Sequence, residues 1–345
     1  MSNRRVFIKQ MSAGAVMAGM PELLLSKPKP VKDKIWGCLL HLSFNMWEEY
    51  ISPHRPFRGY RPTLELSEPL WNDALSKMVA EGMNMVVIDL GNAIKYESHP
   101  EIAVKKAWSV DRLREELQRI RKMGLEPIPK LNFSATHDAW LKEYSRMVST
   151  EKYYSVCSDL IKEVSKIFDK PRFFHLGYDE ETAAHQEHFR YVVIRQDDCW
   201  WKDFNFFVDE VLKNGSRPWI WSDYLWHHSE LFMKNMPKSV LQSNWYYHES
   251  FDPKITDVKA YLDLETAGFD QIPTSGYLGS GDFAMPNEAN TLNTVQFCAK
   301  NVNDTRLLGF LQTFWKPTFE ENRDRIIKGI ELAGNAKRWY LKNKI

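Results

Sequence analysis

The chain has 345 residues, of which 43% are hydrophobic and 26% are charged, and this ordinary composition excludes a disordered or collagen-like protein. Its 46 Lys and Arg residues balance 45 Asp and Glu residues, so no large electrostatic surface for nucleic acid is expected. The four cysteines form no C-x-x-C pair, which argues against both a zinc ribbon and a disulfide scaffold.

The first thirty residues have the pattern of an export signal. The sequence Arg-Arg-Val-Phe-Ile-Lys begins at Arg4, and a weakly apolar stretch of small residues and methionines covers 11–20. This pattern resembles a twin-arginine signal. The apolar stretch is too short to span a bilayer stably. We therefore exclude 1–30 from the fold and expect a bacterial protein exported by the twin-arginine route to the periplasm or cell surface, with no stable membrane span once the signal is removed.

From Lys34 onward, short apolar runs alternate with longer amphipathic ones. The short runs predict buried strands at 35–44, 85–90, 125–133, 172–179, 218–221, 240–245, 270–275 and 307–313. Helix-start and helix-stop residues predict helices between them at about 67–82, 109–124, 150–168, 197–213, from 229, and then at 256–268, 287–301 and 318–340.

This alternation predicts a parallel sheet with right-handed crossovers. Eight strand–helix units that close on themselves form a (β/α)8 TIM barrel, so we expect a single barrel domain over 31–345. The alternative is a doubly wound open sheet, but no G-x-G-x-x-G follows an early strand, and no Pro- or Ser-rich linker divides the chain.

In a barrel of this kind, functional side chains lie at the carboxyl ends of the strands. Carboxylates, histidines and aromatic rings dominate these positions, and aromatic side chains suit a cleft that stacks on sugar rings, although they can equally fill a core. The residues expected there are His41, Asp89, Asn132, His137, Asp179, Glu180, Trp221, Asp223, Trp245, Tyr277 and Trp315.

The sharpest local feature is the run from His175 to Glu180. Alternation along a strand places His175, Gly177 and Asp179 on one face, and Glu180 stands where the strand gives way to a loop. Apolar burial and the neighbouring charge of Asp179 should raise the pKa of Glu180, so that it holds the proton a general acid needs. The alternative reading of the acidic residues is a helix N-terminus, where negative charge is favourable.

The run His175–Glu180, His-Leu-Gly-Tyr-Asp-Glu, resembles the His-x-Gly-Gly-Asp-Glu motif of the family 20 glycoside hydrolases, the β-N-acetylhexosaminidases. Four other places in the chain are similar to that family in barrel order, namely His137, 217–223, 276–278 and Trp315. The resemblance implies a glycan substrate containing β-linked amino sugars or related units, and retaining hydrolysis in which the sugar's own acetamido oxygen attacks C1.

The resemblance also implies individual roles. Glu180 would act as acid and then as base, and Asp179 would orient the acetamide and stabilise the charged oxazolinium. Tyr277 would hydrogen-bond the acetamido oxygen, and no cofactor or metal would be needed. The walls of the pocket would be Trp221, Trp245 and Trp315. From their places in the barrel, we also expect substrate contacts from His41, Asp89, His137, His175 and Asp223.

The chain departs from the family pattern at the groups that hold the sugar. Tyr178 replaces the second motif glycine, and 35–44 has no counterpart of the family's first-strand Arg. Gly279 and Pro317 stand where the family has Asp and Glu. Either the substrate differs or other side chains replace these contacts, and the candidates are Arg55, Arg61, Asp223 and Asp282.

Two other functions fit the sequence. The barrel could bind glycans without hydrolysing them, which is consistent with the missing contacts. It could also be a metal-dependent hydrolase that uses His41, His137 and Asp89. His185 and His188 have the i, i+3 spacing of a zinc pair, but a solvated helix face is the better interpretation because no H-E-x-x-H surrounds them.

Overall fold

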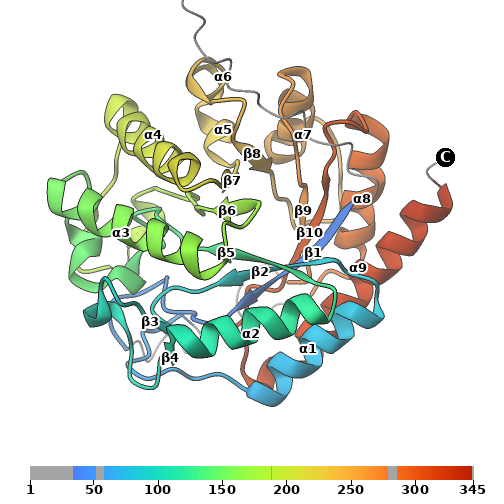
Figure 1. Ribbon diagram of the computed structural model, residues 1–345. Helices are drawn as coiled ribbons and strands as arrows, with labels where there is room; N and C mark the ends of the chain where they lie inside the picture. The colour runs from blue at the N-terminus through green and yellow to red at the C-terminus, as the bar shows by residue number, and fades with distance from the viewer. Residues whose placement is uncertain (1–33, 52–57, 188, 279–285, 344–345) are drawn as a thin grey trace, which may run out of the picture. The chain divides into compact units, whose positions relative to one another are not determined.

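Eight parallel strands form the centre of the fold, and helices surround them (Figure 1). The computed structural model describes residues 34–51, 58–187, 189–278 and 286–343, which belong to one compact unit, Asp33–Ile345. Outside the described residues lie the expected export signal at 1–30 and four single positions, Arg55, His188, Gly279 and Asp282.

The strands of the barrel are β1 (Ile35–His41), β2 (Met85–Asp89), β5 (Glu126–Lys130), β6 (Phe173–His175), β7 (Arg217–Trp221), β8 (Leu241–Ser243), β9 (Thr274–Gly276) and β10 (Gly309–Thr313). They pair in parallel in the order β8-β7-β6-β5-β2-β1-β10-β9. Parallel bridges from Gln242 to Gln271 and from Trp245 to Thr274 join β8 to β9. These bridges complete the circle, and the predicted (β/α)8 barrel is confirmed.

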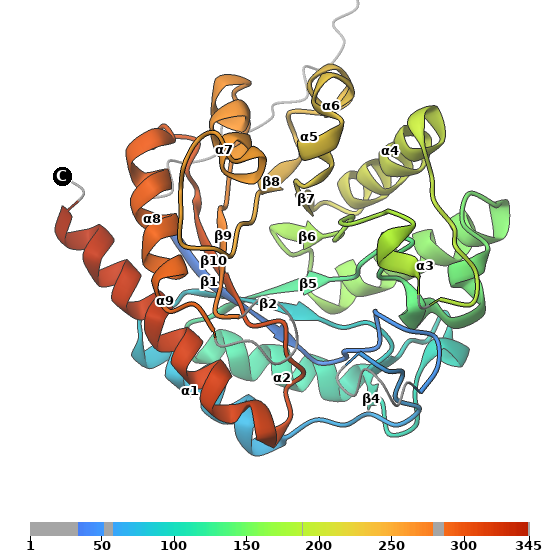
Figure 2. The ribbon, with the colours of Figure 1, turned by 180° about the vertical axis from the view of Figure 1, so that it is seen from behind.

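The helices are α1 (Glu68–Ala80), α2 (Val110–Lys122), α3 (Glu151–Ile167), α4 (Asp197–Lys213), α5 (Tyr224–His227), α6 (Ser229–Asn235), α7 (Thr256–Thr266), α8 (Ala289–Asn301) and α9 (Arg323–Asn343). They lie on the outer side of the strands in both views (Figures 1 and 2). Among the described residues, none of them combines the length and apolar character that crossing a bilayer requires.

Side-chain caps explain where several helices begin. The Ser67 Oγ accepts a hydrogen bond from the backbone N–H of Leu70 at the start of α1. Ser109 caps α2 in the same way, and Thr150 caps α3. Each cap satisfies a backbone donor that would otherwise lack a partner within the helix, which fixes where the chain leaves the preceding loop.

Three expectations about element ends were wrong. The last helix, α9, begins at Arg323 and not at 318, where the hydroxyl of Thr318 donates a hydrogen bond to the backbone oxygen of His41 at 2.7 Å. The seventh strand, β9, is confined to Thr274–Gly276, later than expected. The fourth strand, β6, ends at His175, because Gly177 and Tyr178 adopt positive φ and turn the chain out of the sheet.

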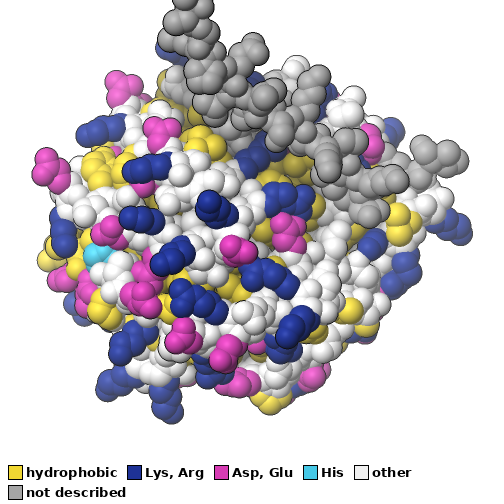
Figure 3. All heavy atoms as spheres, viewed as in Figure 1, with side chains coloured by type: hydrophobic (Ala, Val, Ile, Leu, Met, Phe, Trp, Pro, Cys, Tyr) yellow, Lys and Arg dark blue, Asp and Glu magenta, His cyan; other side chains and the backbone are white. Residues whose placement is uncertain are grey.

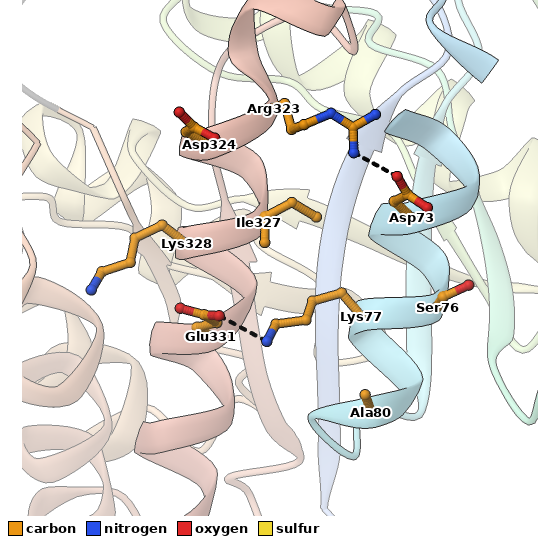
Figure 4. Close-up of a pocket in the computed structure, with 9 residues that line it drawn as sticks. All are labelled: Asp73, Ser76, Lys77, Ala80, Arg323, Asp324, Ile327, Lys328 and Glu331. Carbon is orange, nitrogen blue, oxygen red and sulfur yellow. Dashed lines mark hydrogen bonds and ion pairs between the residues drawn. The ribbon is translucent and has the colours of Figure 1, made fainter. Parts of the chain in front are cut away.

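Two features lie outside the barrel sheet. β3 (Ile94–Lys95) and β4 (Trp108–Ser109) form a small parallel pair between β2 and α2 that the sequence did not predict. A groove of about 630 Å³ lies between α1 and α9, and ion pairs across it join Arg323 to Asp73 and Lys77 to Glu331 (Figure 4). Basic and acidic side chains are interspersed over the face shown in Figure 3.

The barrel interior is packed with apolar side chains that point inward from alternate strand positions. They form a cluster separate from the larger one between strands and helices. Its buried members are Ile35, Leu39, Met85, Val87, Ile128, Phe173, Trp219, Trp221, Leu241, Ile272 and Leu311. The interior is therefore filled, and room for a ligand lies at the mouth, where the strands end.

Candidate active site

The turn after β6 carries both acidic residues. Gly177 and Tyr178 have φ values of +69° and +73°, and Glu180 has a φ of +54°. A Cβ atom on Gly177 would lie 2.2 Å from the side chain of Asn132, so glycine is required there by contact as well as by conformation. The turn brings Asp179 and Glu180 to the mouth of the barrel.

A cavity of about 270 Å³ opens beside these two carboxyl groups. It has an aromatic wall, and its volume suits a single sugar ring rather than an extended chain. The residues that line it are Phe44, Trp47, Arg58, Asp179, Glu180, His185, Trp245, Tyr247, Leu278 and Trp315. Asp179, Glu180, Trp245 and Trp315 had all been predicted at this site from the sequence.

Asp179 is fixed from two sides. Asn132 Nδ2 donates a hydrogen bond to Asp179 Oδ1 at 2.8 Å, and His137 Nε2 lies 3.4 Å from Asp179 Oδ2. The side chain is only 7% exposed. Asp179 is thus a buried carboxylate held in one orientation at the cavity wall, which is what stabilising a developing positive charge requires.

Glu180 shares the same histidine. His137 Nε2 lies 3.2 Å from Glu180 Oε2, and His185 Nε2 lies 3.5 Å from Glu180 Oε1. Burial tends to raise the pKa of Glu180, but the hydrogen bond and charge of His137 outweigh it, and the pKa is lowered. The pKa of His137 is raised, because the charges of Asp179 and Glu180 outweigh its own burial. The expected raised pKa at Glu180 was therefore wrong.

A raised carboxyl pKa is found instead at Asp223, which follows β7. Asp223 Oδ2 accepts a hydrogen bond from the backbone N–H of Glu180 at 2.8 Å, while Oδ1 has no hydrogen-bond partner. Burial, followed by the charges of Asp179 and Glu180, raises the pKa of Asp223 to about 8. Asp223 is thus a neutral acid at neutral pH that holds the backbone of Glu180 in place.

His41 and Asp89 form a buried ionic group with Lys130 inside the barrel. Lys130 Nζ lies 2.5 Å from Asp89 Oδ2, and His41 Nδ1 lies 3.3 Å from the same oxygen. Burial would raise the pKa of Asp89, but the charge of Lys130 and the contact with His41 lower it to about 2. None of the three is among the residues that line the cavity, and Lys130 was not predicted from the sequence.

His175 and Trp221 are also buried within the barrel. His175 Nδ1 accepts a hydrogen bond from the N–H of Gly177 at 3.0 Å, which helps to fix the turn. The rings of His175 and Trp221 are 4.3 Å apart, and Trp221 lies 5.8 Å from Trp315. Both residues support the cavity from behind, and direct contact between either of them and a substrate stays a prediction.

The structure places a different tyrosine at the cavity from the one expected. Tyr277 donates its backbone N–H to Thr313 and is not among the lining residues. Tyr247 lines the cavity, accepts a hydrogen bond from Trp315 Nε1 at 2.8 Å, and stacks on Trp245 with 5.0 Å between ring centroids. Two-residue alternation from Trp245 could have indicated Tyr247.

Arg58 contributes a guanidinium to the cavity, and it was not predicted from the sequence. Its guanidinium lies 4.5 Å above the ring of Trp47, and both residues line the cavity. Arg61, which had been one of the four candidates, contacts Glu65 and lies 4.6 Å above Phe319. Because both arginines lie in an irregular loop, no periodicity in the sequence distinguishes them.

A metal site from His41, His137 and Asp89 is not assembled, since Lys130 occupies the Asp89 carboxylate. Among the described residues, the group that could ligate a metal ion is His137, Asp179 and Glu180, whose ligand atoms lie within 4.8 Å of one another. The same three side chains also form a hydrogen-bonded acid–base group, and this grouping accounts for their closeness without a bound ion.

Comparison with known proteins gives a consistent picture of the fold. No protein-family model matches the chain, and no curated protein matches it in sequence. Solved structures do match. The exo-β-N-acetylglucosaminidase of Vibrio harveyi, described as GH20, has 12% identity and a TM-score of 0.58 over 90% of this chain. The β-N-acetylhexosaminidase of Bacteroides fragilis has 13% identity and a TM-score of 0.61 over 90%.

A third match, the chitobiase of Flavobacterium johnsoniae, has 16% identity and a TM-score of 0.61 over 87% of this chain. The fold is that of the family 20 glycoside hydrolases. The chain spans 57%, 68% and 47% of the lengths of these three structures, so it corresponds to only part of each. The likeness of fold expected from the motif at His175–Glu180 is confirmed.

Proposed function

We propose that this protein is a glycoside hydrolase that acts on β-linked N-acetylhexosamines or closely related sugars, with Glu180 as the acid and base and Asp179 as the group that assists the acetamide. One observation carries this proposal. Asp179 and Glu180 face a single aromatic cavity at the mouth of the barrel, and both are tied to His137, at 3.4 and 3.2 Å.

His137 allows Glu180 to act as an acid although its own pKa is lowered. The opposite pKa shifts of these two groups favour one shared proton that rests on the imidazole before a sugar binds. A sugar that fills the cavity removes water from this ion pair, which favours the neutral form. The proton then moves from His137 Nε2 to Glu180 Oε2 and on to the glycosidic oxygen.

Asp179 supports the other half of the reaction. In the substrate-assisted route, the acetamido oxygen bonds to C1 as the glycosidic bond breaks, and the ring that forms carries positive charge. A fixed, buried carboxylate beside that ring stabilises the charge without having to reorganise. Water then attacks C1 and gives its proton to Glu180, which restores the acid.

Turnover of an aryl β-N-acetylglucosaminide tests the proposal. We expect release of the sugar with retained configuration by NMR, and loss of about 10²–10⁴ in rate for Glu180→Gln with a poor leaving group. Sugar binding without turnover in the wild type would favour the glycan-binding alternative. Activity that chelator abolishes and zinc restores would favour a metal at His137, Asp179 and Glu180.

We also infer export by the twin-arginine route, supported by the Arg-Arg pair at Arg4 and the apolar stretch at 11–20. In a bacterial host with this pathway, the full chain should be found in the periplasmic fraction, and changing both Arg4 and Arg5 to Lys should retain it in the cytoplasm. Equal fractionation of the two chains would contradict the inference.

A further inference from the structure

A second cavity, of about 430 Å³, lies on the other side of Glu180. It is formed by the loop after β6, the start of α4 and the segment around α5. Glu180 lines both cavities, and Asp223 lines the second one only. An acid that protonates a glycosidic oxygen stands between the two sugars that this oxygen joins, so two cavities that share Glu180 suit the two sides of one bond.

Asp223, which lines this second cavity, has an unused polar atom. The residue is 8% exposed, and its Oδ1 has no hydrogen-bond partner, whereas Oδ2 is occupied by the N–H of Glu180. A buried carboxyl oxygen without a partner is costly, and a ligand hydroxyl, which can donate or accept, would satisfy it.

An aromatic stack offers a flat surface at the same place. The ring of Tyr224 lies parallel to Trp200 at 3.9 Å and to His228 at 4.3 Å, each with an interplanar angle of 21°. Two parallel rings this close to Tyr224 must cover its opposite faces. His228 is therefore the last ring on its side of Tyr224, and the outer face of the His228 ring is free of this stack. His228 is exposed and lines the cavity, so a sugar ring can rest against it.

The charges around the cavity are mostly negative. Its lining contains three carboxylates, those of Glu180, Glu181 and Asp197, together with the neutral acid Asp223 and one guanidinium, that of Arg195. Arg195 is already paired with Glu181 at 2.6 Å and with Asp203 at 3.2 Å. Burial and the neighbouring His227 lower the pKa of His228, which keeps it neutral at pH 7. An anionic sugar would therefore meet like charge here.

We propose that this second cavity binds the leaving sugar and selects a neutral or amino sugar over an acidic one such as a uronic acid. The inference rests on the proposed function, since it assigns the cavity to the leaving-group side of the bond that Glu180 protonates. Asp197 supplies the negative charge that would make this choice, and Asp223 offers a neutral hydrogen-bonding group beside it.

Three disaccharides test the inference. Each carries a β-linked N-acetylglucosamine, and the reducing unit is N-acetylglucosamine, glucosamine or glucuronic acid. We expect kcat/KM for the glucuronic acid compound to be about one tenth, or less, of the value for the N-acetylglucosamine compound. The glucosamine compound should have a kcat/KM at least equal to that of the N-acetylglucosamine compound. Equal values for all three, or a preference for the acid, would overturn the inference.

Asp197→Asn removes one of the negative charges without changing the shape of the side chain. We expect it to reduce several-fold the ratio of kcat/KM between the neutral and the acidic compound, which is called the gap below. Asp209→Asn is the matched control, since Asp209 is exposed on the same helix and is not in the cavity lining, and it should leave the gap unchanged. A gap that Asp197→Asn does not alter, or that both variants alter equally, would contradict the inference.

A different result separates this inference from the proposed function. If the wild type hydrolyses none of the three compounds, the proposed function fails, and the cavity is tested by titration calorimetry with N-acetylglucosamine, glucosamine and glucuronic acid as free sugars. The assignment of the cavity would still be supported if N-acetylglucosamine and glucosamine bind and glucuronic acid does not, and if Asp197→Asn reduces this difference in affinity. Binding of none, or tighter binding of glucuronic acid, would reject it.

Discussion

Asp223 makes the stability of the folded chain depend on pH. Its pKa is about 8 in the folded state, against 3.8 for an unperturbed aspartate. The folded chain therefore holds this proton over a pH range where the unfolded chain has lost it. The stability that Asp223 contributes is therefore complete below about pH 4 and is lost as the pH rises through about 8.

Asp223→Asn removes this titration and keeps an acceptor for the N–H of Glu180. We expect the free energy of unfolding of the wild type to fall, relative to that of the variant, as the pH rises from about 4 to about 8. Urea unfolding at several pH values measures the difference. Two curves that stay parallel over this range would show that Asp223 is charged in the folded protein.

We expect His137 to control the protonation of Glu180, and a pH–rate profile tests this directly. In the wild type, the shared proton is lost only above the raised pKa of His137. In His137→Gln, Glu180 must hold the proton alone, so we expect the alkaline limb of kcat/KM to move to lower pH, with a lower maximum.

His185→Gln is the control for this profile. His185 also contacts Glu180, at 3.5 Å, but its side chain is 45% exposed. We expect a smaller displacement of the alkaline limb, because solvent screens this contact more effectively. An alkaline limb that stays in place in His137→Gln would mean that the proton does not come from the His137–Glu180 pair.

Among the local elements, the turn after β6 should be sensitive to a small change, since an added Cβ at Gly177 has no room. In Gly177→Ala, the new Cβ would displace Asn132, whose amide orients Asp179. We expect lower thermal stability together with a large loss of kcat. Gly268→Ala is the matched control, because its φ is also positive, at +77°, but no atom lies within 4 Å of the new Cβ. It should cost about 1 kcal/mol of stability and leave kcat unchanged.

The sequence predicted the regular elements well because their signals are local. Ser67, Ser109 and Thr150 cap their helices through contacts with residues only three positions away. The start of α9 was missed because Thr318 contacts His41, which is distant in sequence. The short β3–β4 pair was missed because two-residue strands leave no periodic pattern.

The candidate site was predicted only in part, for a related reason. Asp179, Glu180, Trp245 and Trp315 follow strands, and their position along the chain is enough to place them at the barrel mouth. Arg58 and Trp47 come from the irregular loop after β1, where contact depends on the folded path alone. The pKa shifts were not predictable, because they depend on His137 meeting both carboxylates at once.

At the scale of the whole molecule, the extent of backbone pairing between neighbouring strands varies around the barrel. β1 and β2 pair continuously from Gly37–Met85 to His41–Asp89, whereas isolated bridges join β8 to β9. We expect the amides along β8 and β9 to exchange with deuterium faster than those of β1 and β2, since local opening begins where pairing is sparse. Uniform protection of all eight strands would contradict this expectation.

The central claim is that Glu180 protonates the leaving group at the mouth of this barrel. The most direct test is a series of aryl β-N-acetylglucosaminides with leaving groups of increasing pKa, hydrolysed by the wild type and by Glu180→Gln. We predict that kcat/KM of the wild type changes little across the series, while that of the variant falls steeply as the leaving group becomes more basic. Equal slopes for the two proteins would show that Glu180 is not the acid.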